Sequence, residues 1–80
     1  LYRLENKVEL ITFEINKNSI AIDIPLKELK IKKGTLIASI LRNGKMIFPG
    51  GNDMIKINDS VMIVSTIPSI EDFDEILERI

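Results

Sequence analysis

Two basic side chains flank a predicted tight turn at Asn43-Gly44. Arg42 precedes the pair and Lys45 follows it, between the apolar runs 36–41 and 46–48. Asn-Gly between such runs predicts a β-hairpin with a two-residue type I′ turn, which sets Arg42 opposite Lys45. Like charges across a strand pair repel. Either both side chains extend into water, or an anion, such as a phosphate or a partner chain's carboxylate, lies between them.

Few residues could carry catalysis. The 80 residues include no His and no Cys, which removes the commonest general base and the strongest nucleophile. Carboxylates four residues apart, as in Glu71 and Glu75, fit a solvated helix face better than an acid–base or metal site. Gly50-Gly51 lacks the spacing of a phosphate-binding loop. We therefore expect no enzyme, and no catalytic residue, metal or cofactor site in this chain.

Charge and hydropathy restrict the partners. Basic and acidic residues number 11 and 12 and are well mixed, which argues against a nucleic-acid surface or a polybasic membrane anchor. The longest apolar runs, about six residues, are far shorter than the roughly 20 that span a bilayer. We expect a linker remnant over 1–7 and a single domain over 8–80, small enough to benefit from oligomerisation.

The remaining patterns predict an α+β fold in the order strand, short helix, hairpin, loop, strand, C-terminal helix. Residues 8–15 alternate as a first strand, and 60–66 form a β-branched strand before the C-terminus. Pro25 suits the first turn of a short helix, with Asp23 as its cap and Gly34 ending the unit.

A helical period begins at Ser69. Ser69 and Asp72 match a capping pattern, and acidic residues crowd the first half of the segment. The apolar residues form one stripe at helical spacing, which predicts a C-terminal helix with an inward face; they are Ile70, Phe73, Ile76, Leu77 and Ile80.

The predicted hairpin register gives two apolar faces. It pairs Ser39 with Phe48 and alternates side chains between the faces. One face carries Ala38, Ile40, Arg42, Lys45 and Ile47, and the other carries Ile37, Leu41, Met46 and Phe48. One face should cover the domain's own core and the other should meet a second subunit. Either face could take either role.

The segments LKELKIKKG, LIASILRNGKMIFPGG and INDSVMIVST, in this order, resemble the TrkA C-terminal domain, also called the RCK C-lobe. Members show an L-x-x-L helix, here Leu26 to Leu29, an apolar strand into R-[ND]-G, here at Arg42, and a Pro after the second hairpin strand, here Pro49. Asn58 replaces the Gly that usually precedes Asp in the last turn, and Asn also tolerates a left-handed backbone.

The resemblance implies a small sheet or pseudo-barrel with helices packed on it, acting as a non-catalytic, cytoplasmic regulatory lobe of a potassium transport system. It implies a homodimer, a membrane-embedded potassium transporter subunit as partner, and a place at the inner face of the membrane. NAD or ATP would bind a preceding Rossmann-like lobe, for which this chain has no G-x-G-x-x-G motif. Alternatives are a C-lobe of another cation or anion transporter, or a purely structural dimerisation domain.

Some relatives bind cyclic di-AMP between two C-lobes through an Arg after the short helix and an Asn entering the next strand, where this chain has Lys32 and Thr35. A small nucleotide ligand is thus implied. Together with the hairpin argument, the candidate ligand or dimer-interface residues are Ile40, Arg42, Asn43, Lys45, Ile47, Lys32 and Thr35.

Overall fold

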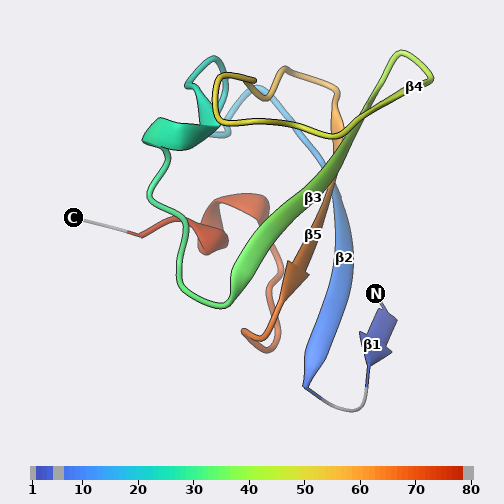
Figure 1. Ribbon diagram of the computed structural model, residues 1–80, viewed down its shortest axis with the longest axis vertical. Helices are drawn as coiled ribbons and strands as arrows, with labels where there is room; N and C mark the ends of the chain where they lie inside the picture. The colour runs from blue at the N-terminus through green and yellow to red at the C-terminus, as the bar shows by residue number, and fades with distance from the viewer. Residues whose placement is uncertain (1, 5–6, 79–80) are drawn as a thin grey trace.

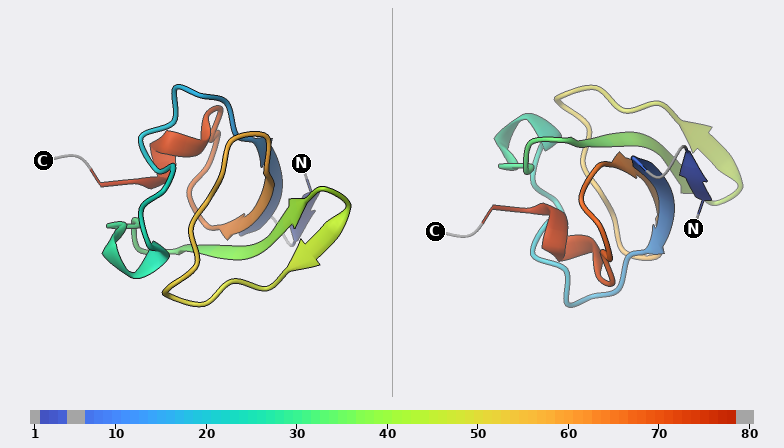
Figure 2. Two further views of the ribbon diagram at one scale, coloured as in Figure 1. Left: turned by 90° about the horizontal axis from the view of Figure 1, so that it is seen from above. Right: turned by 90° about the horizontal axis from the view of Figure 1, so that it is seen from below.

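The computed structural model describes residues 2–4 and 7–78, whose main feature is a five-stranded antiparallel sheet in the order β1-β2-β5-β3-β4 (Figure 1). Two short 3-10 helices, η1 and η2, lie on one side of the sheet (Figure 2). The elements are β1 (Tyr2–Leu4), β2 (Val8–Glu14), η1 (Leu26–Glu28), β3 (Thr35–Arg42), β4 (Lys45–Ile47), β5 (Ser60–Ser65) and η2 (Phe73–Ile76).

Strand β5 is the centre of the sheet because it pairs with both β2 and β3. Its β-branched residues alternate, so Val61 and Ile63 face the core and are fully buried. Cross-strand rows on this face join Ile11, Ile63 and Ile37, and then Phe13, Val61 and Ile40. The predicted strands at 8–15 and 60–66 are confirmed to within one residue at their C-terminal ends.

The hairpin forms as its turn residues dictate. Asn43 and Gly44 have φ of 50° and 76°, the positive values that a type I′ turn requires. The pairs Ile40–Ile47, Leu41–Met46 and Arg42–Lys45 confirm three of the four predicted partners. The fourth was wrong, because β4 ends at Ile47 and Phe48 lies beyond the strand.

A bulge changes which side chains of β3 share a face. The register with β5 shifts between Ile37 and Ser39, and one extra residue reverses the alternation. Ile37 therefore points to the core with Ile40, opposite Ile63 and Val61 respectively. The prediction that Ile37 shares a face with Leu41 was wrong, because local alternation cannot anticipate a bulge.

The first helix is shorter than expected and lacks the predicted cap. The 3-10 turn Leu26–Glu28 begins after Pro25 with no side-chain cap, and Asp23 instead has φ of 64° and pairs with Lys56 at 2.7 Å. Leu26 and Leu29 do pack against the core, as predicted. Backbone bonds from Leu26 and Lys27 to the 51–53 loop hold this turn in place.

The predicted C-terminal helix is absent from the described part of the segment. Only Phe73–Ile76 is helical, as a 3-10 turn capped by Asp72, and Ser69 has φ of 61°. Leu77 is extended and forms an antiparallel bridge with Ile31, flanked by two backbone bonds of 2.8 and 2.7 Å. A helix of this length is only marginally stable in isolation. The segment therefore pairs its backbone with residues 30–32 instead of continuing as a helix. Ile80 lies outside the described residues.

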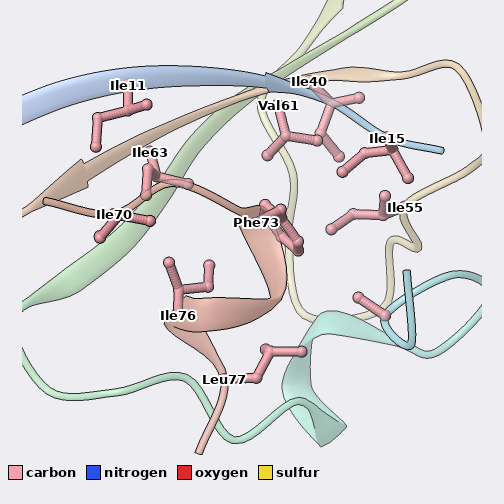
Figure 3. Close-up of a cluster of buried hydrophobic side chains, with 11 residues drawn as sticks. Ile11, Ile15, Ile40, Ile55, Val61, Ile63, Ile70, Phe73, Ile76 and Leu77 are labelled. Carbon is pink, nitrogen blue, oxygen red and sulfur yellow. The ribbon is translucent and has the colours of Figure 1, made fainter. Parts of the chain in front are cut away.

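The predicted apolar stripe nevertheless reaches the core. Figure 3 shows Ile70, Phe73, Ile76 and Leu77 beneath the side chains of the sheet, and Phe73 meets Phe13 edge-on with centroids 6.2 Å apart. The prediction that these four side chains face the core is confirmed, although the predicted helical backbone was wrong. A single turn with extended flanks presents the same side chains as the helix would.

The N-terminal residues also differ from expectation. Tyr2–Leu4, placed in a linker by the sequence, pair with 8–10 as edge strand β1.

Candidate interaction surface

An ion pair anchors the β3–β4 hairpin at the last residue of β3, next to the turn. Arg42 donates from Nε to Asp59 Oδ1 at 2.9 Å and from Nη2 to Oδ2 at 2.8 Å, and Nη2 also donates to the Met54 carbonyl at 2.9 Å. Asp59 is 1% exposed, and its Oδ2 accepts a further bond from the Lys56 amide at 2.8 Å. The hairpin is thereby tied to the 54–59 segment that precedes β5.

The environment keeps both groups charged. Burial would raise the pKa of Asp59, but hydrogen bonds from Arg42 and the Lys56 amide, with the positive charges of both side chains, hold it below its ordinary value. The hydrogen bond to Asp59 raises the pKa of Arg42. A bidentate contact of this kind matches the planar geometry of the guanidinium to the two oxygens of the carboxylate.

Asp59 belongs to this ion pair, but the sequence pattern did not mark it as a candidate. It was assigned only to a turn with Asn58, whose φ of 70° fits that role. The signal that finds it is the pairing of Leu41 with Ser60, since this register places the preceding Asp beside Arg42. The register between two strands that are distant along the chain cannot be deduced from one amino-acid sequence.

The predicted candidates separate into two groups along β3. Arg42, Asn43 and Lys45 lie at the hairpin end, whereas Thr35 begins the strand and Lys32 precedes it. Seven residues of strand correspond to about 23 Å, so one small ligand cannot touch both groups within one chain. Thr35 already pairs its hydroxyl with Ser65 at 2.7 Å.

The hairpin has one covered and one open face. Ile40 is 0% exposed and Ile47 is half-buried against the core, so the hairpin face that carries these two candidates covers the domain itself. The opposite face of the hairpin carries four large, exposed apolar side chains. We call them the outer hairpin patch: Leu36, Leu41, Met46 and Phe48.

The bulge extends this patch along the whole strand. Leu36 pairs with Val64 and Leu41 with Ser60; positions 60 and 64 are an even number of residues apart on β5, so their partners point to the same side. Phe48 is the most exposed of the group at 80%.

A second apolar feature lies on the opposite side of the chain. A hollow of about 290 Å³ is lined by apolar side chains of the 20–29 segment and Leu77, with charged groups at its rim. Its lining residues are Ile20, Ile24, Glu28, Leu29, Lys30, Leu77 and Glu78.

Within residues 2–4 and 7–78, no group of acidic side chains is arranged to hold a metal ion. The same residues contain no helix of a length and hydropathy suited to crossing a bilayer.

Comparison with known proteins gives a family. The TrkA-C domain model matches residues 10–78. Trk system potassium uptake protein trkA homolog 1 of Methanosarcina mazei is 29% identical over 72 residues, covering 90% of this chain and 18% of the relative. A TrkA homolog of Archaeoglobus fulgidus is 34% identical over 65 residues, covering 81% of this chain and 15% of the relative. The chain thus spans less than a fifth of these two relatives.

The fold has a solved counterpart. A structure described as an RCK domain with cda superposes with a TM-score of 0.60 at 20% identity, covering 74% of this chain and 81% of that one. At this level of identity the likeness concerns the fold.

Proposed function

Because the chain belongs to the TrkA-C domain family, we propose that it is a non-catalytic regulatory and dimerisation domain of a potassium transport system. The observation that carries the proposal is the match over 10–78, with relatives that are Trk potassium uptake proteins. Since this chain corresponds to under a fifth of those two relatives, it acts as one module of a larger regulator.

The larger protein supplies the remaining functions. We place the regulator in the cytoplasm, against the inner face of the membrane, where its partner is a membrane-embedded potassium transporter subunit. A separate Rossmann-like lobe binds NAD or ATP. The module described here joins two regulators and transmits the state of the assembly.

Regulation requires a ligand that binds one conformation of the dimer better than another. We propose a small nucleotide as that ligand, and its phosphates would meet the basic residues at one end of β3. Lys45 is exposed at the hairpin tip, whereas Arg42 is held by Asp59. An incoming anion would therefore meet Lys45 directly but would have to displace Asp59 to reach Arg42. At the other end of the strand, Lys32 and Thr35 form the alternative site for such a ligand.

Potassium flux tests the regulatory role. In cells whose uptake depends on the full-length protein, deletion of residues 10–78 should abolish the response of flux to nucleotide while leaving the protein expressed. An unaltered response would contradict the proposal.

Thermal unfolding tests the ligand. NAD, ATP and cyclic di-AMP are added separately to the chain, and a ligand that binds the native state raises Tm by mass action. We expect a rise with one of them that is reduced in Lys45→Glu or Lys32→Glu and kept in Lys17→Glu, an exposed lysine of the 16–19 turn.

A purely structural dimerisation domain is the second candidate. The observation that favours it is the internal pairing of Arg42 with Asp59, which leaves the hairpin with one cation fewer for an anionic ligand. Calorimetry that records no heat with any of the three nucleotides, on a chain that is dimeric, would favour this candidate over a ligand sensor.

A further inference from the structure

We propose that residues 51–56, part of the connection from β4 to β5, couple the Arg42 end of β3 to η1. Arg42 is then a positioning residue, because its contacts set the position of the 51–56 segment and that segment sets the position of η1. The coupling is a property of the single chain without ligand. Only its use in regulation rests on the proposed function.

Arg42 holds one side of the segment. Its Nη2 donates to the Met54 carbonyl at 2.9 Å. Asp59, which accepts two bonds from the same guanidinium, also accepts from the Lys56 amide at 2.8 Å. Each of these bonds has a charged donor or acceptor and is roughly twice as strong as a neutral bond. A change at Arg42 therefore affects two attachments of the same segment.

The other side of the segment holds η1, which Figure 1 shows beside the chain that runs on from β4. The amides of Leu26 and Lys27 donate to the Asp53 and Gly51 carbonyls, both at 2.9 Å. Amides at the start of a helical turn have no partner within the turn itself. Because no side chain caps η1, the carbonyls of 51–53 take that place.

The two sets of attachments meet at Met54. Its carbonyl accepts from Arg42, and its backbone forms an antiparallel bridge with Pro25, the residue directly before η1. A parallel bridge joins the next residue, Ile55, to Ile22. Since the peptide unit is planar and stiff, displacement of the Met54 carbonyl also displaces the residues on either side of it.

Hydrogen bonds, more than packing, fix the exposed part of this segment. Residues 51–53 are exposed and Met54 is half-buried, whereas Ile55 is 0% exposed and anchors the segment in the core. The three residues of η1 are half-buried or exposed. Elements with few buried contacts open locally at low free energy. The opening of η1 should therefore respond to the loss of individual bonds.

The connection extends to the second group of candidate ligand residues. After η1 the chain continues to Lys30 and Lys32, whose backbones are bonded to Glu78 and Ile76 at 2.7 and 2.8 Å. The two ends of β3 are too far apart for one small ligand, but 51–56 and η1 connect them outside the strand. Under the proposed function, a nucleotide bound at either end would alter the contacts at the other, because such coupling is reciprocal.

Amide hydrogen exchange of the 80-residue chain, followed by NMR without ligand, tests the coupling from the Arg42 end. Arg42→Lys keeps the charge but loses the planar fork that reaches all three acceptor atoms. We expect the Leu26 and Lys27 amides to exchange roughly fivefold faster or more. The control Lys45→Gln removes an exposed cation of the same hairpin and should change these rates by less than about twofold. Unchanged rates in Arg42→Lys would overturn the coupling.

The amides of the central strand β5 distinguish local from global opening, because they report on unfolding of the whole domain. The Leu26 and Lys27 amides should exchange faster than those of β5 in the parent chain and in both variants. A single common rate for both groups would mean that η1 opens only with the whole domain, which would also overturn the coupling.

A second pair of variants tests the coupling from the η1 end. A Cβ at Gly51 would lie 3.2 Å from the Lys27 Cβ, so alanine pushes η1 away from the segment. A Cβ at Gly50 would meet an Asp53 carboxylate oxygen at 3.9 Å, an ordinary contact, so Gly50→Ala is the matched control. We expect the Arg42 Nε proton to exchange roughly threefold faster or more in Gly51→Ala, and less than about twofold faster in the control. Equal exchange in these two variants would contradict the proposal.

These measurements are independent of the proposed function because no nucleotide is present. Their failure would leave the regulatory and dimerisation role standing. Conversely, a chain whose Tm is unaffected by all three nucleotides, but whose η1 amides respond to Arg42→Lys, would lose the ligand and retain the coupling.

Discussion

Arg42 and Asp59 are 17 residues apart in sequence, yet the guanidinium donates two hydrogen bonds of 2.9 and 2.8 Å to the carboxylate. The acid is 1% exposed and the base is 32% exposed at its side chain. The carboxylate of Asp59 is therefore shielded from water as in a buried ion pair, whereas the guanidinium of Arg42 is partly solvated as in a surface ion pair. Removing the acid's charge should therefore affect stability more than removing a surface charge.

We expect Asp59→Asn to lower the free energy of unfolding by about 2 kcal/mol, because charge-assisted bonds to Arg42 weaken and the buried amide cannot accept all three bonds. Urea denaturation measures the change. Asp23→Asn is the matched control, since the Asp23–Lys56 pair is exposed, at 63% and 48%, and such pairs contribute about 0.5 kcal/mol. Equal effects of the two substitutions would show that Asp59 contributes no more than an exposed acid.

The same carboxylate predicts a dependence on pH. Its pKa is held below the ordinary value of about 3.8, so the unfolded chain binds its proton first as the pH falls. The stabilisation is therefore complete above the unfolded pKa and is lost on acidification through the lowered folded pKa. Unfolding free energy should fall from about pH 5 downward, with a shallower slope in Asp59→Asn. Parallel slopes in parent and variant would exclude Asp59 as the cause.

The hairpin and the ion pair illustrate what a single sequence contains. Asn43 and Gly44 set the turn and the nearest pairs of β3 with β4 through local backbone chemistry, so these were predictable. The contact of Arg42 with Asp59 depends on the register of β3 against β5, which no local pattern encodes. A bulge between Ile37 and Ser39 then moved Ile37 to the core.

The C-terminal segment shows the limit of periodicity. The inward positions of Phe73 and Ile76 follow from their spacing, and both are buried. Their spacing suits a helix, but it also suits one 3-10 turn followed by an extended residue. The bridge from Leu77 to Ile31 decides between these conformations, and the sequence contains no indication of that partner.

Two glycines with positive φ should respond differently to alanine. Gly34 and Gly44 have φ of 84° and 76°, so alanine strains the backbone by about 1 kcal/mol at each. A Cβ at Gly34 would in addition meet the Thr66 hydroxyl, whereas nothing lies within 4 Å at Gly44. We expect Gly34→Ala to be the more destabilising in thermal unfolding. Thr66→Ala should restore part of the difference, and a double variant no more stable than Gly34→Ala alone would contradict the steric explanation.

The C-terminal turn should depend on one acid. Asp74 accepts from the Ser19 hydroxyl at 2.7 Å and from the Ile20 amide at 2.9 Å, which fastens η2 to the 16–21 loop. We expect Asp74→Ala to destabilise the chain by about 1–2 kcal/mol and Ser19→Ala by about 1 kcal/mol. Because the two groups share a bond, the double variant should lose less than the sum, by about 0.5 kcal/mol or more.

Urea denaturation of the four chains in this cycle gives the coupling energy. Glu71→Ala, an exposed acid of the same segment, serves as the control and should change stability by less than about 0.5 kcal/mol. Strict additivity of Asp74→Ala and Ser19→Ala would mean that the contact contributes nothing to stability. In that case the position of η2 would depend on its other contacts, which include the bond from the Ile20 amide to Asp74, the packing of Phe73 and Ile76, and the bridge from Leu77 to Ile31.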